Sequence, residues 1–139
     1  MNIISILIIS GISTLAMTAF SYLLTLLVKK NLIEPYWLNV VLFQSKTTFR
    51  PLGWILHYMT GIGFLYLQLF ILKFLPENSL ANGLLIGIIE GILGIFMWHT
   101  LFKILFKPDE LKLSWYYLNL LGVHIVFCYT ALYCINYLL

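Results

Sequence analysis

Charged side chains are scarce in this sequence. Asp, Glu, Lys and Arg together make up 9% of the 139 residues, whereas hydrophobic residues make up 62% and the mean hydropathy is +0.98. A soluble domain carries about 25% charged residues. No water-soluble fold of this length could bury so much apolar surface, so the composition excludes a soluble protein and indicates a polytopic membrane protein.

The motifs of familiar catalytic sites are also missing. The sequence has no nucleotide-binding loop, nucleophile elbow, HExxH or CxxC, and the spacing of Cys128 and Cys134 fits neither a zinc site nor a redox site. The eight Lys and Arg residues are too few and too dispersed for a nucleic-acid surface. These absences favour a non-enzymatic protein without a nucleic-acid partner.

The sequence consists mainly of long apolar runs. Four runs, at about residues 3–28, 51–72, 80–106 and 114–138, are each long enough to cross a bilayer, which takes about 20 helical residues. The first lacks a basic leader, so we expect a retained helix and not a cleaved signal peptide. Residues 76–79 are typical of a tight turn.

These runs predict an all-α fold. We expect residues 1–139 to form a single integral membrane domain, an antiparallel up-down four-helix transmembrane bundle in contact with the lipid bilayer. The longest connection, residues 29–50, has an apolar and aromatic middle that is too short to span. It is expected to be an interfacial segment between the first two spans.

The distribution of basic residues predicts the orientation. Seven of the eight lie near the first and third connections, and only Lys73 lies on the other side. By the positive-inside rule, the loops at 29–50 and 107–113 are expected to be cytoplasmic, with both termini outside. The seven are Lys29, Lys30, Lys46, Arg50, Lys103, Lys107 and Lys112.

The third span carries an acid among glycines. Gly83, Gly87, Gly91 and Gly94 recur at helical spacing beside Glu90, so this face is expected to pack closely on another helix. An ionisable group at membrane depth is costly and is a candidate functional residue. Glu90 is either a structural hydrogen-bonding residue or a proton or cation carrier; its expected partners are Gln68, Thr14, Thr130 and Tyr133.

Three histidines, His57, His99 and His124, lie at similar depths in the second, third and fourth spans. His57 and His124 are expected to face a common cavity, with Thr18 and Ser21 closing it from the first span. Two imidazoles could clamp a metal ion or a haem iron. The alternatives are buried hydrogen-bonding histidines, or histidines that handle a proton or a ligand.

Several segments carry a resemblance to a known group of proteins. They are residues 11–22 (GISTLAMTAFSY), 53–64 (GWILHYMTGIGF), 116–127 (YYLNLLGVHIVF) and the glycine run that ends at Trp98. With these segments the chain resembles a family of small bacterial four-span membrane proteins of unknown function. The resemblance implies a bacterial inner-membrane location and supplies no activity, substrate or catalytic residue.

Two functional classes follow. The first is a non-enzymatic accessory subunit or binding module for a lipid, quinone or haem-like ligand inside the bundle, working as a homodimer or with another membrane protein. The second is a proton- or ion-coupled carrier or membrane enzyme that uses Glu90 and the histidines. The candidate ligand-binding residues are His57, His99, His124, Glu90, Thr18, Ser21 and Gln68, with His57 and His124 as candidate metal ligands.

Overall fold

The computed structural model describes residues 1–75 and 79–137, and within them the chain is all-α. Its helices are α1 (Ile3–Val28), α2 (Glu34–Phe43), α3 (Pro51–Leu72), α4 (Leu80–Ile104) and α5 (Leu113–Tyr137). Four of these described helices, all except α2, are long and apolar enough to cross a membrane. The predicted fold class is confirmed, with span ends within two residues of those expected. The turn expected at residues 76–79 falls on positions 76–78, which lie outside the described residues.

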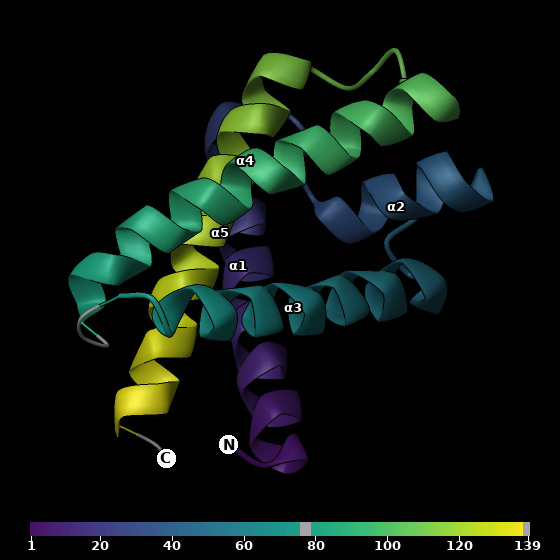
Figure 1. The fold of residues 1–139 in the computed structure, drawn as a ribbon. Coiled ribbons are helices and arrows are strands. Elements are labelled where there is room, and N and C mark those ends of the chain that lie inside the picture. The colour runs from purple at the N-terminus through teal and green to yellow at the C-terminus, as the bar shows by residue number, and fades with distance from the viewer. Residues whose placement is uncertain (76–78, 138–139) are drawn as a thin grey trace.

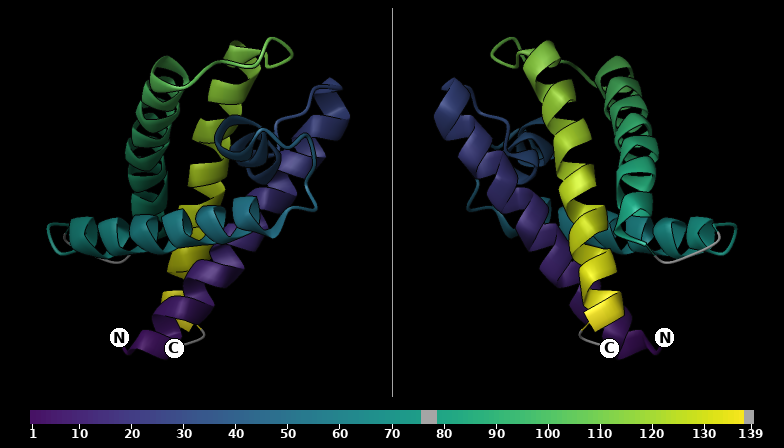
Figure 2. Two further views of the ribbon diagram at one scale, coloured as in Figure 1. Left: turned by 90° about the vertical axis from the view of Figure 1, so that its right-hand side faces the viewer. Right: turned by 90° about the vertical axis from the view of Figure 1, so that its left-hand side faces the viewer.

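The glycine face of α4 packs against α5, as predicted. A Cβ atom added at Gly87 would lie 2.6 Å from the Cα of Ile125, and one at Gly91 would lie 2.9 Å from the Cα of Leu121. Backbones can approach this closely only where one helix has no side chain. The other face of α4 is exposed, in agreement with lipid contact. α5 also packs along α1, and Figures 1 and 2 show these two helices running side by side.

The segment between the first two spans is a helix that packs into the protein. Trp37, Val40 and Val41 of α2 are buried, and Asn39 fixes α2 to the start of α3. The Asn39 Oδ1 atom accepts a hydrogen bond from the Gly53 backbone N–H at 2.9 Å, while its Nδ2 donates to two loop carbonyls at 2.8 and 3.1 Å. α2 is therefore held in place by a buried amide, with its first residue directed toward the core.

α3 crosses the upright pair formed by α1 and α5 at a steep angle (Figures 1 and 2). It packs mainly on α1 and α2, and only lightly on α4 and α5. One close contact with α1 is at Gly61, where an added Cβ would clash with the hydroxyl of Thr14. The bundle is thus splayed on the side where α3 and α4 face each other.

The connections at 29–50 and 105–112 lie at one end of the molecule. Lys46 and Glu110, one from each connection, form an ion pair at 2.7 Å. The start of α1 and the last turn of α5 lie together at the opposite end (Figure 1). α1 and α5 run between these two ends, whereas α3 lies across them (Figures 1 and 2).

Candidate functional site

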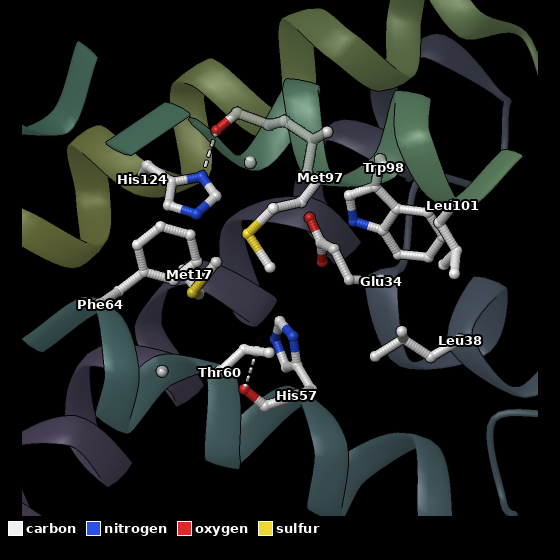
Figure 3. Close-up of a pocket in the computed structure, with 13 residues that line it drawn as sticks. Met17, Glu34, Leu38, His57, Thr60, Phe64, Met97, Trp98, Leu101 and His124 are labelled. Atoms are coloured by element: carbon white, nitrogen blue, oxygen red, sulfur yellow. Dashed lines mark hydrogen bonds between the residues drawn. The ribbon is translucent and has the colours of Figure 1, made fainter. Parts of the chain in front are cut away.

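A cavity of about 180 Å³ lies between α3 and α4 and reaches inward to α1, α2 and α5. It sits where two hydrophobic clusters meet, since Met17 belongs to one cluster and Trp98 and Leu120 to the other. Most of its wall is apolar (Figure 3). The lining residues are Met17, Glu34, Leu38, His57, Thr60, Gly61, Phe64, Gly94, Met97, Trp98, Leu101, Leu120 and His124.

Three ionisable side chains reach this cavity from different helices. Figure 3 shows Glu34 of α2, His57 of α3 and His124 of α5 pointing into the same space. All three are buried. The common cavity expected for His57 and His124 is therefore present, and it contains a third ionisable group, Glu34.

His124 is held by its own helix. Its ring Nδ1 lies 2.7 Å from the carbonyl oxygen of Leu120, and its edge packs against Phe64 with ring centroids 4.5 Å apart. A Cβ at Gly94 would lie 2.7 Å from the ring, so the glycine makes room for the imidazole. The other nitrogen, Nε2, is buried and has no hydrogen-bond partner among the described residues.

His57 is anchored to α1 through a chain of hydrogen bonds. Its Nε2 lies 2.9 Å from the hydroxyl oxygen of Thr18, and that hydroxyl lies 2.7 Å from the carbonyl oxygen of Thr14. Thr14 and Thr18 lie four residues apart on one buried face of α1. Thr18 therefore positions the His57 ring through a hydrogen bond.

Glu34 enters the core because it is the first residue of α2, directly before Pro35. Ser21 donates a hydrogen bond to its carboxylate at 2.9 Å, and the Asn119 Nδ2 donates another at 2.7 Å. The same amide donates to the carbonyl oxygen of Leu32 at 3.1 Å, which ties the loop before α2 to α5. Burial raises the pKa of Glu34 from 4.5 to about 7, although these hydrogen bonds act to lower it.

The cavity opens sideways. Thr60 on α3 and Met97 on α4 are exposed, whereas the polar groups farther in are buried. Both helices are membrane-length spans. The exposed rim of the cavity therefore lies between two helices that are each long and apolar enough to cross a bilayer.

Glu90 lies in a separate polar cluster. It is fully buried, as expected, but its partner is Cys128, whose thiol donates to Glu90 Oε2 at 3.1 Å. The expected candidate Gln68 instead donates to the Cys128 carbonyl at 3.0 Å. Neither Glu90, Gln68 nor Cys128 lines the cavity. A direct relay from Glu90 to the histidines has no hydrogen-bonded path among the described residues.

The remaining sequence candidates fall in different places. His99 is exposed on α4, with its Nδ1 3.2 Å from the hydroxyl of Tyr117, and it does not line the cavity. Ser21 donates to Glu34, and neither Ser21 nor Thr18 lines the cavity that both were expected to close. No group of three or more His, Cys, Asp or Glu close enough to hold a metal ion occurs in the part of the chain that the structure describes. Metal binding by His57 and His124 stays a prediction.

Sequence reasoning missed Glu34 and Asn119. Glu34 lies in the 29–50 connection, outside the predicted spans, although Leu32, Ile33 and Pro35 around it are apolar. Asn119, in the middle of an apolar run, is the kind of buried amide that bonds across membrane helices. The chain matches no family model, no curated protein and no solved structure, so no family is identified. Its four long apolar helices indicate a small four-span membrane protein.

Proposed function

We propose that this protein is a non-enzymatic binding module that takes a lipophilic molecule with a polar head, of the lipid or quinone class, from the bilayer into the cavity between α3 and α4. The observation that carries the proposal is the cavity itself, with an apolar wall, a sideways opening and three buried polar groups at its inner end. Ligand sites commonly combine an apolar lining with a few convergent polar groups.

The cavity volume limits what can be enclosed. Sites for drug-sized ligands measure about 300–1,000 Å³, and an apolar cavity of about 150 Å³ holds a benzene molecule. A cavity of about 180 Å³ therefore encloses one ring or one head group, while an attached chain remains in the lipid. A haem macrocycle is too large to be enclosed, so the proposal favours a lipid or a quinone over a haem-like ligand.

The setting of this module is part of the proposal. The asymmetry of basic residues supports an orientation with the 29–50 and 107–113 loops in the cytoplasm. The resemblance to small bacterial four-span proteins supports a bacterial inner-membrane location. The lack of a catalytic motif supports a role as a subunit that presents or senses its ligand, in a homodimer or beside another membrane protein.

A second candidate function is favoured by one observation. Glu34 changes charge near neutral pH, because its pKa is about 7, and it shares the cavity with two imidazoles. Such a group could take up or release a proton as the ligand binds. A proton-coupled carrier would use Glu34 in this role, in place of Glu90.

Native mass spectrometry of the protein released from membranes tests the binding function. We expect a bound apolar molecule that is lost in Met97→Trp, because the larger side chain fills the cavity mouth. The matched control is Phe96→Trp, since Phe96 is exposed on the same helix and does not line the cavity. Absence of a bound molecule, or equal retention by both variants, would contradict the proposal.

A further inference from the structure

The hydrogen-bonding state of His124 can be derived from its partner. A backbone carbonyl only accepts, so the ring nitrogen 2.7 Å from the Leu120 oxygen, Nδ1, must carry the proton. Neither His57 nor His124 lies within ion-pair distance of a carboxylate among the described residues, and an unpaired charge at membrane depth costs several kcal/mol. The ring is therefore neutral, and its Nε2 is a buried acceptor with no donor facing it.

The protonated ring nitrogen of His57 can be derived in the same way, through the hydroxyl of Thr18. The single hydroxyl proton of Thr18 is directed to the Thr14 carbonyl at 2.7 Å, because that oxygen can only accept. The Thr18 oxygen is then the acceptor for His57 Nε2, which must be the protonated nitrogen. His57 Nδ1 is left as an acceptor, so each imidazole has one acceptor nitrogen that its own anchor does not use.

The rest of the lining does not supply a cationic donor. No Lys or Arg lines the cavity in the described part of the chain, so a phosphate head would have no counter-ion. A head that bears only carbonyl oxygens would place lone pairs against the lone pair of His124 Nε2. A buried acceptor left without a donor costs about 1–3 kcal/mol, and a ligand that supplies the donor removes that cost.

We infer that the molecule bound in this cavity carries a hydroxyl group, as a phenol, a hydroquinone or a lipid alcohol does, and that this hydroxyl donates a hydrogen bond to His124 Nε2. The inference rests on the proposed binding function and narrows its ligand class. The reduced form of a quinone would bind in preference to the oxidised form, because only the reduced form has a proton to donate.

Two probes of nearly equal shape test the hydroxyl inference separately from the proposed binding function. Fluorine NMR of the detergent-solubilised protein would measure the binding of 4-fluorophenol and 4-fluorotoluene, which differ in a hydroxyl against a methyl group. After correction for partition into protein-free micelles, we expect wild type to prefer 4-fluorophenol roughly fivefold, as one hydrogen bond of about 1 kcal/mol gives. His124→Phe should lose this preference and still bind 4-fluorotoluene.

The outcomes are distinct. Equal binding of both probes to wild type would overturn the hydroxyl inference and leave the proposed binding function intact. If wild type binds neither probe, the hydroxyl inference and the binding function are both wrong. Should His124→Phe not fold, nitrogen NMR of histidine-labelled wild type decides: 4-fluorophenol, but not 4-fluorotoluene, should shift an unprotonated ring-nitrogen signal, and no such shift would refute the hydrogen bond.

Discussion

Glu34 shows how a carboxyl group is accommodated in the core without a cation. The ion pair found among the described residues is Lys46–Glu110, which is exposed at the loops. Glu34 is instead held by a hydroxyl and an amide, from Ser21 and Asn119. Neutral donors stabilise a carboxylate less than a paired cation does, so the balance between burial and hydrogen bonding leaves this group titrating near neutral pH.

This titration predicts a pH-dependent stability. The pKa of Glu34 rises from 4.5 to about 7 on folding, so the folded state binds the proton more tightly than the unfolded state. Its contribution to stability is complete below about pH 4.5, falls as the pH rises, and is lost above about pH 7; the rise corresponds to about 3 kcal/mol. Glu34→Gln cannot ionise and should remove this slope. The measurement is thermal unfolding in detergent between pH 5 and pH 8.

Other titratable groups face Glu34, so the prediction concerns the difference in pH-dependent stability between wild type and Glu34→Gln. His57 and His124 lie across the cavity and Tyr116 lies nearby, and all three are present in both proteins. Subtracting the Glu34→Gln profile from the wild-type profile therefore isolates the carboxyl group. Parallel pH profiles would show that Glu34 stays in one charge state throughout this range.

At the residue scale, the sequence predicted the positions that follow helical periodicity. His57 and His124 could be placed in one cavity because they lie at similar depths in their spans. Glu34 could not be found in this way, because its burial depends on how α2 packs, and α2 lies outside every span. The expected partners of Glu90 were wrong for another reason: Cys128 lies on the same face of α5 as His124, four residues away, but its thiol was not considered as a donor.

At the element scale, the contact between α4 and α5 gives a second prediction. Gly87→Leu would place a side chain where the Ile125 Cα leaves 2.6 Å, so the helices must separate, and overpacking of this kind costs about 1–3 kcal/mol or more. Ile89→Leu on the exposed face of the same helix should change stability by less than about 0.5 kcal/mol. The measurement is the melting temperature of each variant in detergent. Equal melting temperatures would mean that α4 and α5 can separate at Gly87 without a loss of stability.

The bounds of the helices were predictable, whereas their crossing angles were not. Span length follows from bilayer thickness, which hydropathy reports directly. The steep crossing of α3 follows from specific contacts, above all the Asn39 amide on Gly53, which fixes one end of α3 to α2. A Cβ at Gly53 would lie 2.5 Å from the Pro35 carbonyl oxygen, so this junction also requires a glycine.

At the scale of the whole molecule, the cavity results from two modes of packing. α1, α4 and α5 form a close-packed unit through glycines and small polar residues, whereas α2 and α3 form a second unit held together by the Asn39 amide. The two units meet closely at α1 and diverge at α4. The cavity lies in this divergence, and the polar groups at its inner end come from both units: Glu34 and His57 from one, and His124 from the other.

The orientation of this arrangement in the membrane gives the last prediction. The loop that contains Asp109 is expected in the cytoplasm and the connection that contains Ser79 outside, because Lys and Arg near the spans are retained on the cytoplasmic side. In intact cells, a membrane-impermeant maleimide should label Ser79→Cys and should label Asp109→Cys only after the cells are broken. Both positions leave the number of basic residues unchanged, and the native Cys128 and Cys134 are buried, so wild type serves as the unlabelled control. Labelling of Asp109→Cys but not Ser79→Cys in intact cells would invert the orientation. The α2 end of the molecule would then face outward, and the sideways opening between α3 and α4 would be unchanged, because entry from lipid does not depend on which end is cytoplasmic.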